Sequence, residues 1–207
     1  MAADFLLVFI PMFIVIDPFG VLPVFISLTK DMAPASRRMT IRYSVLFATS
    51  LLVVFALAGK AILDYLSVSI EALMITGGLL LLVIGILMLY EGDMPRSRRK
   101  GPEEPEDERT PEDVAFVPLG TPMLAGPGAI SVVIILTGTA DIPLVLISLV
   151  VVMLICAAVI WRAELLFRLL GNAGARALTR VMGLLTSAYA VQMVLDGIAG
   201  YVDSIGA

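Results

Sequence analysis

The sequence predicts an all-α polytopic membrane protein with six transmembrane helices, arranged as two inverted-topology repeats of three helices whose first helices are broken. Three observations predict this fold class. The chain of 207 residues is 59% hydrophobic and has a mean hydropathy of +1.01, well above the values of soluble domains. Its apolar residues form long blocks near the roughly 20 residues that cross a bilayer. A charged stretch separates these blocks into two groups of three.

Six apolar blocks are long enough to be membrane spans. They lie at residues 5–29, 43–59 (extending as far as 66), 72–90, 114–139, 142–160 and 181–199. Residues 1–91 therefore hold the first three-helix repeat, and residues 114–207 hold the second. Residues 92–113 carry 13 of the 32 charged residues, several prolines and no aromatic side chain, a composition that predicts a disordered, solvated linker. No basic residue precedes the first block, so it is expected to be a retained span rather than a cleaved signal.

The basic residues indicate how the spans are oriented. Thirteen of the 14 Lys and Arg residues fall at the first, third and fifth connections, and Lys60 alone falls on the other side. Because basic residues collect in cytoplasmic loops, both termini are expected outside the cell and the 92–113 linker inside. Residues 162–176 mix Arg with Leu and are expected to form a short amphipathic helix along the cytoplasmic surface, with Trp161 as an interface anchor.

Short internal similarities support a duplication. Span 1 begins with Phe-Ile-Pro-Met at 9–12 and span 4 with Phe-Val-Pro-Leu at 116–119, and each is followed by a Gly- and Pro-containing interruption, at 17–20 and 126–129. Span 1 would enter from outside and span 4 from the cytoplasm, so the halves have opposite topology. Inverted repeats with broken first helices are typical of secondary transporters, whose sites lie at the breaks near the midplane.

The first break is Asp17-Pro18-Phe19-Gly20, at the centre of the apolar run 5–29. Pro18 has no N–H to donate, and Asp followed by Pro is a typical helix start. Span 1 is therefore predicted to be two half-helices, the second opening at Asp17. Capping alone is one interpretation of Asp17. A neutral residue would also cap, however, and an acid at mid-depth costs roughly 3 kcal/mol on insertion scales, so a functional role is favoured.

The second break reads PLGTPMLAGPG at 118–128, and its three prolines and three glycines cannot remain a regular helix. The half-helix is predicted to restart near Pro127 or Gly128 without an acidic cap. Its first N–H groups and its positive dipole end would then be available to an anion. A kink that only eases helix packing is the alternative interpretation.

Together the two breaks predict a site for a small zwitterion. The ammonium group would face Asp17, and the carboxylate would face Gly126, Gly128 and Ala129, where the glycines leave room for only a small side chain. Thr121 is a weaker candidate, which could contribute its hydroxyl to the site. Gln192, near the centre of span 6, is another weaker candidate, which could form a hydrogen bond with the substrate or with a facing backbone break. Both could equally be structural. Close helix packing is expected at the glycines of spans 3 and 6, namely Gly77, Gly78 and Gly183.

Several other chemistries lack the residues they need. The chain has no histidine and one cysteine, Cys156 in span 5, so no metal site, disulfide or cofactor is expected and Cys156 is interpreted as packing. No Ser/His, paired-Asp or HExxH arrangement lies in the spans and no P-loop occurs, so neither an enzyme nor an ATP-driven pump is expected. A channel or metal transporter would need several ligating side chains at depth, and an adaptor would act through its acidic linker.

The distinctive stretches of the chain resemble the MarC family, also called the small neutral amino acid transporter family. The resemblance rests on IDPFGVLPVFISLT at 16–29, GGLLLLVIGILML at 77–89, TPMLAGPGAISVVI at 121–134 and RVMGLLTSAYAVQMVLDGI at 180–198. It implies a six-span protein of the cell inner membrane whose two break motifs line a substrate path. The site residues that it implies are Asp17, Pro18, Gly20, Gly126, Pro127 and Gly128, with Gln192 less central.

The leading hypothesis is a secondary transporter of small neutral amino acids such as glycine and alanine. Asp17 would couple it to a proton or sodium gradient, and the sequence does not choose between the two ions. The alternative is an exporter of drugs or small metabolites, which predicts a roomy apolar cavity and indifference to Asp17. The expected partners are the amino acid, H⁺ or Na⁺ and the lipid bilayer. A homo-oligomer is left open, and no nucleic acid is expected to bind.

Overall fold

The computed structural model describes residues 2–29, 32–91 and 111–206, and every regular element in these residues is helical. The elements in chain order are α1 (Ala2–Ile16), α2 (Val21–Thr29), α3 (Pro34–Tyr65), α4 (Ile70–Glu91), α5 (Pro111–Val114), the π-helical segment η2 (Ala115–Leu124), α6 (Pro127–Thr139), α7 (Ile142–Trp161) and α8 (Ala163–Gly206).

The prediction of an all-helical protein with several membrane spans is confirmed. Four helices are long and apolar enough to cross a bilayer, in α3, α4, α7 and α8, and α1 with α2 makes a fifth candidate that is bent by 43°. The predicted span 114–139 is divided, because α6 has only 13 residues and follows the irregular η2. A sixth crossing and the inverted repeat stay predictions.

The predicted linker lies mostly outside the described residues. Of the predicted range 92–113, residues 92–110 are not described, and residues 111–113 belong to the single turn of α5. Pro111 occupies the first position of that turn, where its missing N–H leaves no helical hydrogen bond unmade. The second group of helices therefore begins slightly before the predicted boundary at 114.

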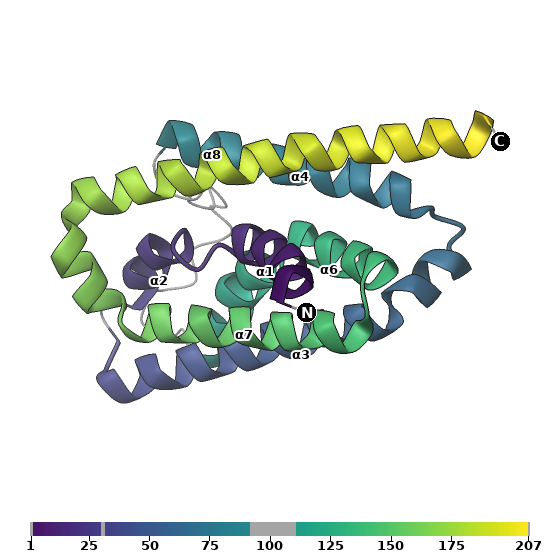
Figure 1. Ribbon diagram of the computed structural model, residues 1–207. Coiled ribbons are helices and arrows are strands. Elements are labelled where there is room, and N and C mark those ends of the chain that lie inside the picture. Colours follow the sequence, from purple (N-terminus) through teal and green to yellow (C-terminus); the bar gives the residue numbers. More distant parts are fainter. Residues whose placement is uncertain (1, 30–31, 92–110, 207) are drawn as a thin grey trace, which may run out of the picture.

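The long helices form two antiparallel pairs (Figure 1). α4 lies beside α8 along one side of the molecule, and α3 lies beside α7 along the other. Between the two pairs lie the broken segments, with α1 and α6 in contact and α2 in contact with η2. Along the chain, α1 to α2 runs in the opposite direction to η2 to α6 (Figure 1). The irregular backbone thus lies between the pairs of regular helices, although Val117 of η2 is 68% exposed.

Glycines bring α4 and α8 together at backbone distance. A Cβ at Gly78 would lie 2.8 Å from the carbonyl oxygen of Ala190, and a Cβ at Gly183 would lie 2.9 Å from that of Gly85. Farther along, a Cβ at Gly197 would meet the Glu71 carbonyl at 2.9 Å. Small residues replace the hydrophobic effect as the basis of helix association in lipid, because they let backbones approach. The prediction of close packing in spans 3 and 6 is confirmed.

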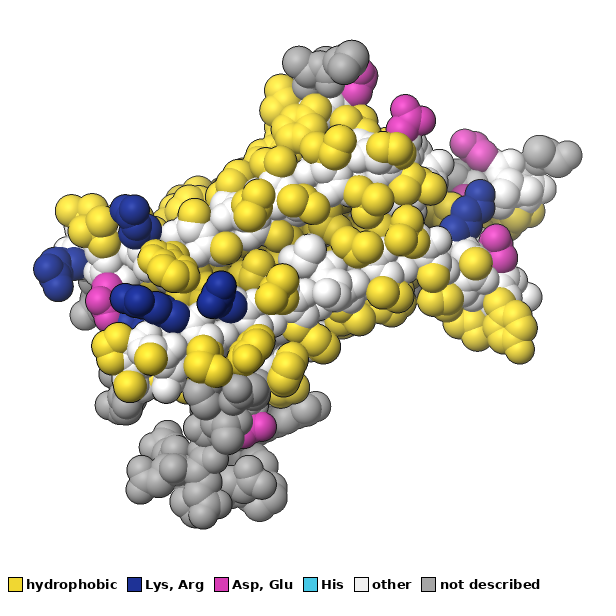
Figure 2. Space-filling view, turned by 90° about the horizontal axis from the view of Figure 1, so that it is seen from below, with side chains coloured by type: hydrophobic (Ala, Val, Ile, Leu, Met, Phe, Trp, Pro, Cys, Tyr) yellow, Lys and Arg dark blue, Asp and Glu magenta, His cyan; other side chains and the backbone are white. Residues whose placement is uncertain are grey.

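Arginines gather at one end of the bundle, where Figure 2 shows most of the Lys and Arg side chains of that face together. The first turns of α3 meet the end of α7 there: Arg37 forms an ion pair with Glu164 and lies 5.1 Å from the centre of the Phe25 ring, and Arg38 lies 6.0 Å from the Trp161 ring. Lys60 is in the last turns of α3 and therefore belongs to the other end. The charge asymmetry predicted from the loops is present in three dimensions.

The predicted amphipathic helix at 162–176 is shorter than expected. α8 is helical from Ala163, but Gly171 has φ 62° and ψ 178°, a conformation that interrupts the helix. Residues 163–170 thus form a separate short helix, and the apolar span covers Ala173–Ile205. The prediction was wrong at its C-terminal end because glycine at 171 ends the first helix.

Candidate functional site

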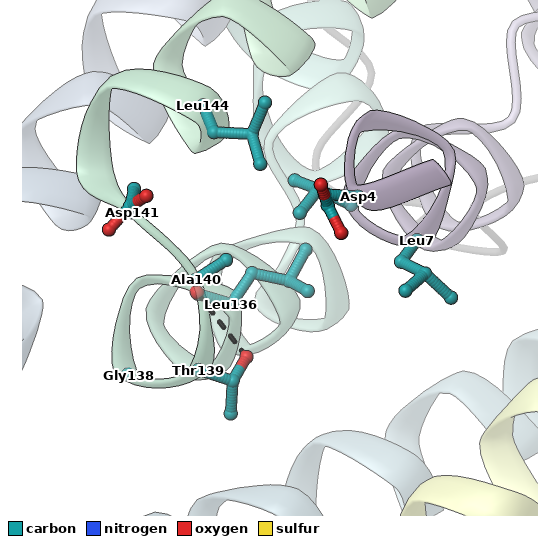
Figure 3. Close-up of a pocket in the computed structure, with 9 residues that line it drawn as sticks. Asp4, Leu7, Leu136, Gly138, Thr139, Ala140, Asp141 and Leu144 are labelled. Carbon is teal, nitrogen blue, oxygen red and sulfur yellow. Dashed lines mark hydrogen bonds between the residues drawn. The ribbon is translucent and has the colours of Figure 1, made fainter. Parts of the chain in front are cut away.

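A cavity of about 620 Å³ lies between the start of α1 and the α6–α7 turn (Figure 3). Asp4, Leu7 and Leu144 are among the residues that line it, and Asp141 lies at its edge. None of the residues predicted for the substrate site lines this cavity. The predicted site therefore has to be sought at the two breaks, deeper along α1 and α6.

The first break turns on an unusual backbone conformation at Asp17. α1 ends at Ile16, the Asp17 N–H still donates to the Phe13 carbonyl at 3.1 Å, and Asp17 has φ 48°. Positive φ is uncommon outside glycine, although aspartate tolerates it better than most residues. Residues 18–20 form a turn, and α2 opens at Val21. The prediction that the half-helix opens at Asp17 is wrong by four residues, because the left-handed conformation redirects the chain first.

Within the described residues, only one of the two carboxyl oxygens of Asp17 has a hydrogen-bond partner. Asp17 is only 2% exposed, and its Oδ1 accepts a hydrogen bond from the Gly20 N–H at 3.0 Å. Its Oδ2 is buried and has no hydrogen-bond partner among the described residues. A buried polar atom without a partner costs on the order of 1–3 kcal/mol, and more if it is charged. Capping therefore accounts for one oxygen of Asp17 and leaves the other unexplained.

Gly20 is required by the position of that carboxyl group. A Cβ at Gly20 would lie 2.7 Å from Asp17 Cγ and 3.0 Å from the Met88 methyl carbon on α4. Any larger residue would push the carboxyl group out of its place. The Met88 side chain of α4 thus packs against the first break.

Pro18 leaves one backbone carbonyl of α1 without its usual donor, and a side chain of a neighbouring helix donates to this carbonyl instead. In a regular helix the Ile14 carbonyl would accept from residue 18, but proline has no N–H. The hydroxyl of Thr186 on α8 donates to the Ile14 carbonyl instead, at a long 3.5 Å. Ser and Thr side chains commonly satisfy such freed groups in membrane helices. Sequence reasoning missed Thr186, whose only signal is a hydroxyl within an apolar span.

The second break has the predicted form. Val117 and Thr121 leave the helical conformation, with Thr121 at φ −133° and ψ 132°, and Gly126 is extended. α6 then restarts at Pro127 as predicted, with no side-chain cap on its first turn. The Ile130 N–H donates to the Gly126 carbonyl at 3.0 Å, so the N–H groups of the preceding residues are those a helix start leaves free.

Both breaks face one side of α4. A Cβ at Gly128 would lie 2.7 Å from Leu81 Cγ, while Gly20 is the glycine that meets Met88. Leu81 and Met88 are almost fully buried and lie seven residues apart, which places them on one helix face about 10 Å apart along the axis. This spacing could not be found from the sequence, because leucine and methionine fill every face of that apolar segment.

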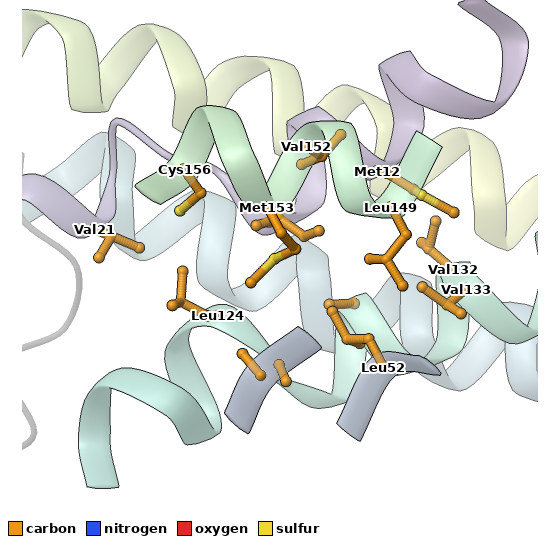
Figure 4. Close-up of a cluster of buried hydrophobic side chains, with 14 of the residues drawn as sticks. Met12, Val21, Leu52, Leu124, Val132, Val133, Leu149, Val152, Met153 and Cys156 are labelled. Atoms are coloured by element: carbon orange, nitrogen blue, oxygen red, sulfur yellow. The ribbon is translucent and has the colours of Figure 1, made fainter. Parts of the chain in front are cut away.

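The buried core joins the two breaks. Val21, just after the first break, and Leu124, just before the second, lie in one hydrophobic cluster with Cys156 and Met153 of α7 (Figure 4). Cys156 is free and buried, as its packing role predicts. Ser148 on the same helix has a buried hydroxyl without a hydrogen-bond partner among the described residues. The sequence carries no pattern that singles out Ser148.

The remaining predicted site residues fall in different places. Pro18 and Ala129 are buried, Thr121 is partly buried, and Pro127 is exposed. Gln192 is exposed, and its Nε2 donates to Asp196 Oδ1 at 2.7 Å on the outer side of α8. The structure therefore brings the two break motifs together along α4 and does not bring Gln192 to them. No group of three or more metal-ligating side chains occurs in the described part of the chain.

Gly128→Ala tests the contact between α6 and α4. Overpacking Leu81 should destabilise the protein by about 1–3 kcal/mol, which corresponds to a thermal midpoint lowered by roughly 2–10 °C in a chain of this size. Thermal unfolding in detergent measures it. Gly138→Ala is the matched control on the same helix, since its Cβ would meet only the end of Ile70 at 3.2 Å. Equal midpoints for the two variants would contradict the contact.

Comparison with known proteins agrees with this architecture. A family model described as MarC family integral membrane protein matches residues 2–202. A UPF0056 membrane protein of Methanocaldococcus jannaschii is 36% identical over 200 residues, covering 95% of this chain and 96% of the relative. The UPF0056 inner membrane protein YhgN of Escherichia coli is 33% identical over 189 residues, covering 89% of this chain and 91% of the relative. No solved structure matches the chain.

Proposed function

The chain belongs to the MarC family of integral membrane proteins, and we propose that it is a secondary transporter of small neutral amino acids coupled to a proton or sodium gradient. The observation that carries this proposal is the unsatisfied oxygen of Asp17, buried at a helix break inside a membrane-spanning bundle. Ionisable residues at such depth are costly and mark substrate or ion pathways. A neutral side chain would also cap the helix, so capping alone does not explain a carboxylate at this depth.

The second break supplies the complementary group. The uncapped first turn of α6 presents backbone donors at the positive end of a helix dipole. Gly20 and Gly128 meet the side chains of Met88 and Leu81, which lie two turns, about 10 Å, apart along α4. A zwitterion with its ammonium group towards Asp17 and its carboxylate towards Gly126, Gly128 and Ala129 matches this polarity. The close glycine contacts favour a ligand with a small side chain.

The arrangement of the helices supports alternating access. α3 pairs with α7 and α4 with α8, each pair antiparallel, and the broken segments run in opposite directions between them (Figure 1). This arrangement is the one expected if residues 1–91 and 114–207 are two inverted three-helix repeats with the breaks at their interface. In transporters of this kind one unit rocks against the other around a central site. Asp17 is closed to solvent, which corresponds to an occluded conformation.

The clustered arginines support the proposed orientation. The end that carries Arg37, Arg38 and Arg162 is placed in the cytoplasm by the rule for basic residues, with both termini outside and residues 92–113 inside. The Escherichia coli relative is named an inner membrane protein, and we propose the same membrane here. Transport requires no bond to be made or broken, and we assign the chain no catalytic residue and no cofactor.

Counterflow in proteoliposomes tests the proposal. Vesicles loaded with unlabelled alanine should accumulate labelled glycine or alanine transiently, whereas vesicles loaded with leucine should not, because the glycine-lined breaks exclude a large side chain. Imposed pH and Na⁺ gradients, applied separately, should drive net uptake under one of the two conditions. The same vesicles without protein set the background.

The exporter of drugs or small metabolites is the rival outcome of the same experiment. It would give no counterflow of glycine or alanine from a folded, monodisperse protein and would give exchange of larger apolar cations instead. That result would remove the amino acid proposal. It would also move attention from the breaks to the cavity between α1 and the α6–α7 turn.

A further inference from the structure

A short helix lies across the arginine-rich end of the bundle. Residues 163–170 follow α7 and are separated from the apolar span Ala173–Ile205 by Gly171, whose φ of 62° breaks the helix. Between α7 and the long part of α8, this segment runs across the end of the bundle rather than along it (Figure 1). In a protein whose long helices cross a membrane, such a segment lies in the plane of the membrane surface.

The exposed side of this helix is divided into an apolar and a basic strip. Leu165 and Leu169 lie one turn apart on this helix and are 47% and 75% exposed, and Trp161, at the end of α7 just before it, is 53% exposed. Arg168 is exposed beside them, while Ala163 faces inward with no exposed surface. Large apolar side chains at such exposure would be unfavourable in water, and next to an arginine they have the pattern of a helix half-inserted into the headgroup region.

The arginines around this helix have no carboxylate partner among the described residues. Arg162 and Arg168 lie at the helix, and Arg176 and Arg180 are exposed in the first turns of the span after Gly171. Glu164 is committed to Arg37, and none of the four arginines forms an ion pair within the described part of the chain. The surface therefore carries an excess of guanidinium groups beside exposed leucines.

We propose that Trp161, Leu165, Arg168, Leu169, Arg176 and Arg180 form a binding surface for anionic phospholipids, called here the α7–α8 basic surface. The apolar strip enters the boundary of the acyl chains, and the guanidinium groups bind headgroup phosphates, whose geometry they match with paired N–H donors. Zwitterionic lipids offer phosphate too, but their headgroup ammonium offsets it. The net positive charge therefore selects anionic lipids, each basic residue near the surface adding to the attraction.

Trp161 is the only tryptophan of the chain, so its fluorescence reports on this surface directly. The full-length protein is reconstituted in phosphatidylcholine vesicles that contain a fixed minority of phosphatidylglycerol, with bromine atoms on the acyl chains of either one lipid or the other. Bromine quenches tryptophan only in contact range. Per mole of brominated lipid, phosphatidylglycerol should quench Trp161 more strongly than phosphatidylcholine. The expected ratio of the two quenching efficiencies is on the order of five, the factor expected from one basic residue at an anionic surface.

The variant R168Q/R176Q/R180Q should lower the ratio clearly, because three of the four arginines around the helix are gone. Lys60→Gln, which removes one cation at the other end of α3, is the matched control and should leave the ratio unchanged. Quenching of the triple variant by brominated phosphatidylcholine at the level of the native chain shows that Trp161 still lies in the bilayer.

Three results would overturn the proposal: equal quenching of the native chain by the two lipids, no quenching by either, or a ratio that survives the triple substitution. A second test measures the quenching ratio of the native chain at raised salt concentration. The ratio should fall, because salt screens the attraction between the arginines and the anionic headgroups. None of these readouts depends on whether the protein transports amino acids.

Discussion

Asp17→Asn should abolish gradient-driven accumulation of glycine and weaken its binding by about 10–100-fold, the cost of losing a charge-assisted hydrogen bond. The substitution is close to isosteric, and the asparagine carbonyl oxygen can still accept the hydrogen bond that Asp17 Oδ1 accepts from the Gly20 N–H. What it removes is the charge and the proton-binding capacity of the second oxygen, which has no partner in the described structure. The substitution therefore distinguishes the role of Asp17 as a helix cap from its role in binding the substrate or the coupling ion.

Binding and transport are measured together in the counterflow assay, under imposed pH and Na⁺ gradients. Asp196→Asn is the matched control, because Asp196 also lies in an apolar span but is exposed and bonded to Gln192. It should behave like the native chain. If Asp17→Asn also keeps native affinity and native response to both gradients, Asp17 is a helix cap and nothing more. A thermal midpoint near that of the native chain would confirm that any loss is not a failure to fold.

Hydropathy and the breaker residues predicted most of the fold. Lipid leaves no alternative to helices for an apolar block of about 20 residues, because every backbone polar group must be satisfied within the segment. Pro18 and the Gly-Pro-Gly at 126–128 marked the interruptions, since their effect on a helix is local and independent of neighbours. α6 accordingly restarts at Pro127, one of the two residues predicted for its start.

Helix ends were predicted less well. α3 begins at Pro34, nine residues before the predicted start at 43. Arg37, Arg38 and Arg42 lie within its first turns, and an apolar window cannot detect turns that extend into the headgroup region. At the first break the local rule for Asp-Pro placed the helix start at Asp17, whereas the positive φ of that residue moved it to Val21. That conformation accompanies the hydrogen bond from the Gly20 N–H to the Asp17 carboxyl group.

The side of each helix on which a residue lies was the feature that the sequence predicted least well. In a soluble helix the polar residues mark the outer side, but in lipid both the core side and the outer side are apolar. The sequence thus placed Gln192 near the centre of span 6 without indicating that it lies on the exposed side of α8. For the same reason Leu81 and Met88, which meet the two breaks, could not be distinguished from their neighbours in α4.

Gly183→Ala should lower the thermal midpoint more than any other single-methyl change considered for this chain. Its Cβ would lie 2.9 Å from the Gly85 carbonyl oxygen, 2.8 Å from Met88 Cβ and 3.2 Å from the Leu89 nitrogen. Two of these atoms are backbone and cannot rotate away, so α4 and α8 must separate. Overpacking of this kind costs about 1–3 kcal/mol and occasionally more. Alanine should otherwise gain up to about 1 kcal/mol of helix propensity over glycine, so the measured loss underestimates the contact.

The reciprocal geometry allows a double-mutant test. A Cβ at Gly85 would lie 2.8 Å from the Gly183 carbonyl and 2.9 Å from the Ser187 nitrogen, so either substitution alone forces the same separation. Adding the second substitution to the first should then lower the free energy of unfolding by less than either substitution does alone. The double variant should therefore be destabilised by less than the sum of the two single variants. Gly200→Ala, whose Cβ would meet only the flexible Glu71 side chain at 3.2 Å, is the control on the same pair of helices. Because α4 also carries Leu81 and Met88, the separation should disturb both breaks. Strict additivity with small losses would mean that α4 and α8 do not meet at Gly85 and Gly183.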